Sequence, residues 1–416
     1  MMRSAAVAPC ELPAALRWVP VHKQVNSRAE SPLTRWSTSP VILGIGVGLL
    51  AGPQGLKLIE PQLSEDGALI QSLCEAVLLI CLFCAGLRLR APLEWAPWRV
   101  PAQLASLTTV SAVLLSAGAG YLIFGMSLLQ SLLLAVILAP TDAVLASDAY
   151  AVAEGEQELV PFALAAEGAV TSAIVAPVVV LVLTRMGVAG AGTAVLGSLT
   201  LTVFWSLAGG AIVGWLIGAG AARWLALIDR DRQGDLLEEM IVFATGALAY
   251  VCALALRSDA LLAALAAGLA LSHAGRRRVT RKQPLGMRVL RFAGRAERGA
   301  TVLLMVLLGT LLGAAEFTAR TALYAAVLLI LVRPLAVRLG LGRPVVTPAQ
   351  RRTLELFAAR GPAALYCLAL AASGHDLPPA FGRQLENAVL VVIVVSIISG
   401  AVSALTARKP SPGAAL

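Results

Sequence analysis

Long runs of apolar residues, separated by short polar segments, dominate the chain from residue 40 onward. Each run approaches the ~20 residues that an α-helix needs to cross the hydrocarbon core of a membrane. None alternates apolar and polar residues, as a lipid-exposed barrel strand does. The pattern predicts an all-α polytopic membrane protein of about twelve transmembrane helices, at 40–59, 69–87, 103–124, 126–150, 160–184, 199–222, 236–256, 259–273, 299–315, 319–339, 353–373 and 386–406.

Composition and charge support this topology. The chain has 416 residues, of which 58% are hydrophobic and only 14% charged, whereas soluble domains average about 25% charged residues. The net charge of +9 does not indicate a nucleic-acid partner, because most basic residues fall in loops on one side of the membrane. By the positive-inside rule that side is the cytoplasm of a bacterial inner membrane, and both termini lie there. The outer loops receive only Lys57, Arg185, Arg257, Arg320 and Arg383.

The remaining segments show little chemistry of their own. Residues 1–38 are polar and mixed in charge, which predicts a cytoplasmic tail, and residues 409–416 form a second short tail. Cys81 and Cys84 have the spacing of a redox or metal motif, but a thiolate inside an apolar helix is poorly solvated. We interpret them as small core residues. We expect no cofactor and no zinc or haem site in these segments.

Charged residues deep in the membrane are the best candidates for function, because each costs ~2.5–3.5 kcal/mol even on the mildest scale. Charges near the ends of the predicted spans, such as Glu75, can reach the interface and are set aside. Asp148 is close to such an end. The charged residues that remain deep are Asp142, Glu167, Arg333 and Arg360.

Asp142 follows a proline in the fourth predicted span. Pro140 removes one helical hydrogen bond and clashes with the preceding turn. Backbone polar groups freed at this depth must line a cavity or be buried against protein. A carboxylate at the break can bind a cation or carry a proton. The alternative is that Asp142 only caps the second half of the helix.

Glu167 and Arg333 are each unfavourable alone in an apolar environment. Buried charges of opposite sign are stabilised by pairing, so we expect a structural ion pair between them. The alternatives are that Glu167 pairs with Arg360 or handles ions directly.

Arg360 precedes Gly361 and Pro362, which interrupt the eleventh predicted span at mid-depth. Two interrupted helices in corresponding positions of two halves are the best sequence pointer to a transporter site. We expect the half-helix ends to meet at the membrane midplane, where Arg360 compensates the carbonyl dipoles.

These segments resemble the NhaP-type sodium/proton and potassium/proton exchangers of the cation/proton antiporter superfamily. The most specific part is Ile137–Asp148, where the family pattern is A-P-T-D-P-V-L-A and Ala143 replaces the proline. The resemblance covers roughly residues 40–406 and includes Phe83–Leu89, Arg333–Pro334, Phe357–Gly361 and Val395–Gly400.

The resemblance implies a membrane domain at 39–408 with inverted repeats and two discontinuous helices that cross. It implies a transport domain (about 103–184 and 319–406) that moves like an elevator against a dimerisation domain (about 40–87 and 199–315). It also implies a lipid-embedded homodimer that exchanges a monovalent cation, Na⁺ or K⁺, for protons.

One departure from the family concerns its main ion-binding group. The family has an Asn-Asp pair just after the glutamate matched by Glu167, and this chain has Thr171 and Ser172 there. Hydroxyls can bind a cation but do not titrate near neutral pH. We therefore expect Asp142 to carry the proton, with Thr141, Thr171 and Ser172 as oxygen ligands.

The missing aspartate leaves other functions open. The chain could be a non-exchanging paralogue that acts as a scaffold or sensor. It could also transport another small solute on the same scaffold. An intramembrane enzyme is the weakest alternative, because no predicted span carries a histidine or lysine at mid-depth to serve as a base.

Overall fold

The structure is a computed structural model that describes residues 39–89, 91, 94–142, 159–188, 196–227, 235–277, 287–342, 346–357, 359–373 and 377–406. The two predicted tails, Asp148 and the second half of the fourth predicted span lie outside the described residues. Within them, every regular element is helical. The prediction of an all-α membrane fold is confirmed.

The first half of the chain forms α1 (Ser39–Ala51), α2 (Leu63–Arg88), α3 (Trp95–Gln103), the π-helical turn η3 (Leu104–Thr108), α4 (Thr109–Phe124), α5 (Leu128–Ile137), α7 (Leu159–Arg185) and α8 (Leu196–Leu227). The second half forms α9 (Asp235–Ala255), α10 (Ala260–Arg277), α11 (Met287–Leu312), α12 (Ala319–Val327), the π-helical turn η5 (Leu328–Val332), α13 (Arg333–Gly340), α14 (Pro348–Leu356), α15 (Pro362–Ala372) and α16 (Pro379–Thr406).

Every predicted span coincides with at least one of these helices. Six described helical stretches are long and apolar enough to cross a membrane, and shorter apolar helices account for the others. The first predicted span was too long, because the helix ends at Ala51 rather than near residue 59. Gly52 and Pro53 follow, and a proline cannot continue the hydrogen-bonding pattern of a helix.

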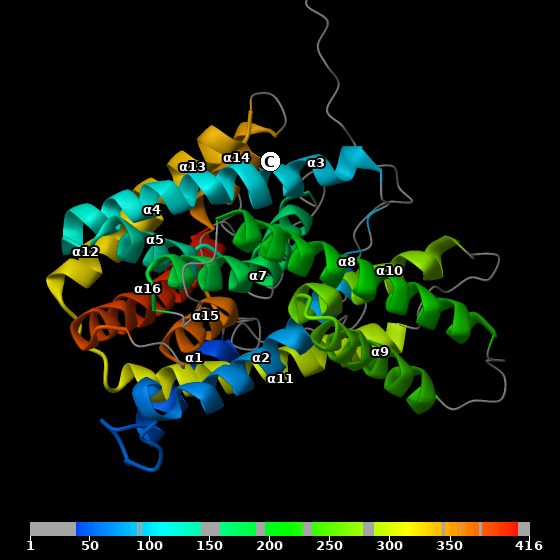
Figure 1. The fold of residues 1–416 in the computed structure, drawn as a ribbon, viewed down its shortest axis with the longest axis horizontal. Coiled ribbons are helices and arrows are strands. Elements are labelled where there is room, and N and C mark those ends of the chain that lie inside the picture. The colour runs from blue at the N-terminus through cyan, green and yellow to red at the C-terminus, as the bar shows by residue number, and fades with distance from the viewer. Residues whose placement is uncertain are drawn as a thin grey trace, which may run out of the picture.

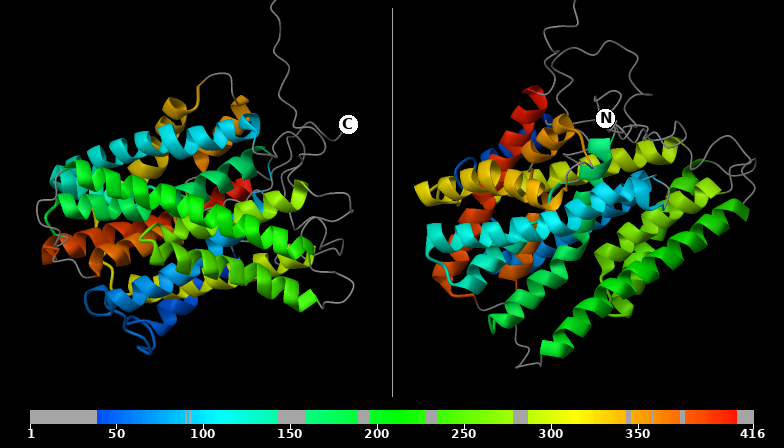
Figure 2. Two further views of the ribbon diagram at one scale, coloured as in Figure 1. Left: turned by 45° about the vertical axis from the view of Figure 1, so that its right-hand side comes forward. Right: turned by 90° about the horizontal axis from the view of Figure 1, so that it is seen from above.

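The helices pack in two groups (Figure 1). In the first, α10 contacts α8, α9 and α2, while α1 packs on α11. In the second, α4 contacts α5, α12 packs on α16, and α13 packs on both α4 and α14. Figure 2 shows α8, α9 and α10 together on one flank. The groups meet where α2 packs against α7 and α15.

Small residues allow close helix packing within the first group. A Cβ added at Gly214 or Gly218 of α8 would collide with the backbone of α10 at Ala263 or Ala267. This G-x-x-x-G spacing lets helix backbones approach closely in a membrane, where van der Waals packing replaces the hydrophobic effect between helices. Since α10 also packs on α2, this tight α8–α10 contact helps to position α2, which lines the cavity described below.

Candidate functional site

The fourth span is interrupted where the sequence predicts it. α5 begins at a capping box formed by Ser127 and Gln130. Its last regular hydrogen bond runs from the Leu138 amide to the Leu134 carbonyl, at 3.2 Å. Pro140 lacks an amide hydrogen, so the chain leaves the helix and runs unwound to Asp142.

The eleventh span is interrupted in the same manner. α14 ends at Leu356, and α15 begins with Pro362 at its first position, where a missing amide costs nothing. The two unwound segments cross. The Asp142 amide donates a hydrogen bond of 3.0 Å to the Ala359 carbonyl, so the crossing is held by backbone groups that neither half-helix satisfies.

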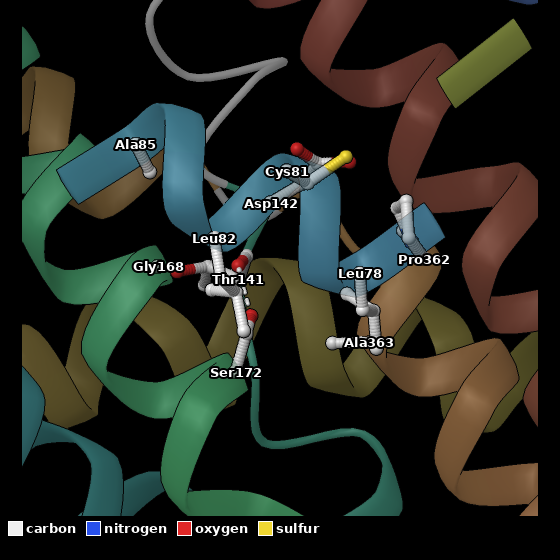
Figure 3. A pocket seen from close by; sticks show the side chains of 11 residues that line it. Leu78, Cys81, Leu82, Ala85, Thr141, Asp142, Gly168, Ser172, Pro362 and Ala363 are labelled. Carbon is white, nitrogen blue, oxygen red and sulfur yellow. Dashed lines mark hydrogen bonds between the residues drawn. The ribbon is translucent and has the colours of Figure 1, made fainter. Parts of the chain in front are cut away.

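A small buried cavity lies at this crossing (Figure 3). Its polar lining comes from Thr141, Asp142 and Ser172, and its apolar lining from α2 and α15. The Ser172 hydroxyl of α7 donates a 3.5 Å hydrogen bond to the Thr141 carbonyl. About 20 Å³ is open to a water-sized sphere, which is room for about one water molecule or one dehydrated cation.

The Asp142 carboxylate occupies the electropositive end of a helix. The residue is 5% exposed and lies beside Gly361 at the start of α15, where the helix dipole favours negative charge. A Cβ added at Gly361 would collide with Oδ2 of Asp142. A glycine is therefore required for the carboxylate to approach the helix end this closely.

We expect Gly361→Ala to weaken cation binding without unfolding the protein. Overpacking of a tight site costs about 1–3 kcal/mol, which corresponds to a loss of affinity of about 5- to 150-fold if it falls on the bound state. Isothermal calorimetry with Na⁺ checks this. Gly382→Ala is the matched control, because an added Cβ there meets no atom within 4 Å. Equal affinity in the two variants would show that the close approach is not needed.

The two threonines proposed as oxygen ligands differ in position. The Thr141 hydroxyl lines the cavity and is buried without a hydrogen-bond partner among the described residues. The Thr171 hydroxyl bonds to the Glu167 carbonyl of its own helix at 2.8 Å and is not part of the lining. Since adjacent helical residues point about 100° apart, only Ser172 of the pair reaches the cavity.

Glu167 and Arg333 form a two-pronged ion pair behind the crossing. Nη1 and Nη2 of Arg333 donate to the two carboxylate oxygens of Glu167 at 2.6 and 2.9 Å. Nε donates to the Leu354 carbonyl at 3.3 Å. Arg333 thus neutralises Glu167 and satisfies a carbonyl in the last turn of α14.

Arg360 binds the carbonyl groups that follow the C-terminal end of α5. Its Nη1 donates to the carbonyl of Ala139, and to that of Pro140 at 3.3 Å. Its own amide donates to the Ser396 hydroxyl of α16 at 2.8 Å. The C-terminal ends of α5 and α14 each carry unpaired carbonyls and partial negative charge, and each faces an arginine.

Sequence reasoning missed the residues that close the cavity from the other helix group. The α2 residues Leu78, Cys81, Leu82 and Ala85, together with Gly168 of α7, belong to the lining. Figure 3 shows the Cys81 sulfur beside Asp142, on the helix that passes over the crossing. Cys81 is a buried free thiol within 3.8 Å of the Thr301 hydroxyl. The sequence shows that these α2 residues share one helical face, because they repeat every three to four residues. It does not show that this face packs over the crossing.

Unwound segments that cross around a buried carboxylate are typical of membrane transporters. The profile of a family described as "Sodium/hydrogen exchanger, transmembrane" matches residues 31–408. The chain therefore belongs to the sodium/hydrogen exchanger family, whose members exchange Na⁺ and H⁺, and the NhaP-type resemblance is confirmed.

Solved structures show the same fold. The sodium proton antiporter MjNhaP1 from Methanocaldococcus jannaschii at pH 8 aligns with a TM-score of 0.72 and 17% identity, covering 88% of this chain and 91% of that one. An electron-microscopy structure of MjNhaP1 aligns with a TM-score of 0.67 and 16% identity, over 89% and 92% of the two chains. No curated protein matches the sequence.

Proposed function

We propose that this protein exchanges a monovalent cation, Na⁺ or K⁺, for protons across the bacterial inner membrane, with Asp142 as the shared carboxylate. The observation that supports this most directly is the cavity at the crossing, where the Asp142 carboxylate is buried beside the Thr141 and Ser172 hydroxyls. Oxygen ligands suit hard cations such as these.

Coupling follows from competition for one carboxylate. Asp142 holds either a proton or a cation, and each neutralises its charge. An empty, ionised Asp142 would carry a bare charge through a low-dielectric environment, which is strongly unfavourable. The loaded forms move and the empty form does not, so one ion is exchanged for the other. Thr141 and Ser172 bind the cation without titrating.

The movement that exposes the site belongs to the same proposal. We propose that residues 103–184 and 319–406 form the transport domain, and 40–87 and 199–315 a dimerisation domain. The packing of α2 against α7 and α15 supports a boundary at the cavity. A homodimer with both chain termini in the cytoplasm, as the loop charges indicate, completes the proposal.

The function is tested in proteoliposomes that enclose a pH-sensitive dye. We expect added Na⁺ or K⁺ to drive proton movement through the purified wild-type protein, and the two rates show which cation it exchanges faster. Choline chloride and protein-free liposomes control for osmotic and leak effects. Initial rates over a series of cation concentrations give the apparent KM for each cation, and repeating the series at several pH values gives its pH dependence.

The replacement of the family aspartate by Ser172 favours two other candidates: a non-exchanging paralogue that acts as a scaffold or sensor, and a transporter of another small solute on the same scaffold. Folded wild-type protein that moves no protons with either cation at any pH would support these candidates over antiport. Sodium binding measured by calorimetry then separates the two remaining alternatives. A scaffold is expected to bind no sodium, whereas a sodium-coupled transporter of another solute retains binding.

A further inference from the structure

The cavity wall on α2 continues along one face of that helix. Leu78, Leu82 and Ala85 repeat at the 3–4 residue spacing of a single helical face. Seven residues before Leu82 on this face is Glu75, two turns and about 10 Å from it along the axis. The sequence placed Glu75 near a span end, but it lies at the middle of α2 (Leu63–Arg88).

A second helix, α15, also runs from the cavity toward Glu75. Its first residues, Pro362 and Ala363, line the cavity. Tyr366, one turn further on, is buried and lies within electrostatic range of Glu75. From the cavity, α2 and α15 therefore both run toward Glu75. They pack against each other at the contact between the two helix groups.

Three described groups near Glu75 are phenols or a carboxylate. The Tyr250 hydroxyl of α9 donates a 2.7 Å hydrogen bond to Oε1 of Glu75. Asp259, just before α10, lies within electrostatic range of Glu75, as Tyr366 of α15 does. Tyr250 therefore contacts Glu75, while Asp259 and Tyr366 are near enough to interact with it electrostatically.

Three other glutamates of the membrane helices differ in this respect. Glu167, Glu297 and Glu355 form ion pairs with Arg333, Arg88 and Arg338, respectively. A carboxylate paired with an arginine stays ionised and is a poor acceptor for a second cation. Glu75 instead accepts a hydrogen bond from a phenol, which brings no positive charge that would compete with a bound cation.

We propose that Glu75 is a second carboxylate of the exchange path, which passes cations and protons between Asp142 and the side of the membrane at which α2 begins. The inference rests on the proposed antiport. It adds a carboxylate on α2, which belongs to the proposed dimerisation domain, in a chain that has the hydroxyl of Ser172 where the family has an aspartate. By the loop charges, this side is the outside.

Glu75→Gln tests the inference in proteoliposomes with the full-length protein. We expect the apparent KM for Na⁺ added on the Leu63 side of α2 to rise about 5-fold or more, while the KM from the opposite side changes less than about 2-fold. Glu65→Gln removes an exposed carboxylate of the same helix and is the matched control. Tyr250→Phe keeps the carboxylate but removes its donor, and we expect it to shift the pH profile of the rate.

The outcomes separate this inference from the antiport itself. If wild-type protein exchanges ions and Glu75→Gln matches Glu65→Gln in both KM values and in its pH profile, the inference is overturned and the antiport stands. Wild-type protein that moves no protons overturns both. If Glu75→Gln does not fold, an unchanged pH profile in Tyr250→Phe overturns the role of Glu75.

Discussion

Asp142→Asn is expected to abolish cation-driven proton movement and leave the protein folded. Asparagine has nearly the same shape, so the backbone hydrogen bond from residue 142 to the Ala359 carbonyl is preserved. It neither titrates nor carries the charge that balances a cation. Loss of a group that transfers a proton lowers rates by about 100-fold or more. The measurement is the initial rate of dye response in proteoliposomes after a Na⁺ addition.

Binding gives an independent readout of the same change. Sodium that binds only the folded protein raises its thermal stability in proportion to the logarithm of its concentration. We expect this stabilisation in wild type and its loss in Asp142→Asn. Asp66→Asn, at the start of α2, is the matched control and is expected to behave like wild type. An Asp142→Asn protein that still exchanges ions at the wild-type rate would move the titrating role to another carboxylate.

The predictability of the fold has a simple physical basis. In lipid, backbone polar groups must be satisfied within each span, so long apolar runs define the helices. Proline and glycine mark the interruptions, as Pro140 and Pro362 do. The end of α1 at Ala51 was misjudged because apolar residues such as Leu56 and Leu58 continue past the turn at Gly52.

The site was only partly predictable. Charge depletion made Asp142 visible, since a deep carboxylate stands out from an apolar helix. The orientation of a hydroxyl carries no such signal, which is why Thr171 and Ser172 could not be distinguished. The approach of α2 depends on long-range packing of Gly86 on α10, and no local pattern reports it. Glu75 was set aside because the start of its helix was placed six residues too late, at 69 rather than 63.

Arg333→Met is expected to destabilise the protein by about 3–5 kcal/mol, because it leaves the Glu167 charge buried without a partner. Glu167 is 1% exposed, so water cannot replace the guanidinium. The Leu354 carbonyl also loses its donor at the end of α14. Unfolding in detergent, followed by tryptophan fluorescence, measures the loss. Arg338→Met is the control. It breaks the Glu355 pair, in which the arginine is 63% and the glutamate 10% exposed, so water can reach part of this pair and the loss of stability is expected to be smaller than at Arg333.

The double variant Glu167→Leu with Arg333→Met separates structural from ion-handling roles. Removing both charges replaces a buried ion pair by apolar side chains, which is often neutral or stabilising. We expect it to be more stable than Arg333→Met alone and less stable than wild type by about 1 kcal/mol, because both variants lose the Leu354 hydrogen bond. Exchange in a stable double variant assigns the pair to structure. A stable double variant that binds sodium but no longer exchanges it would contradict this and give Glu167 a part in ion movement. An Arg333→Met protein as stable as wild type would mean that neither the ion pair nor the Leu354 hydrogen bond contributes to stability.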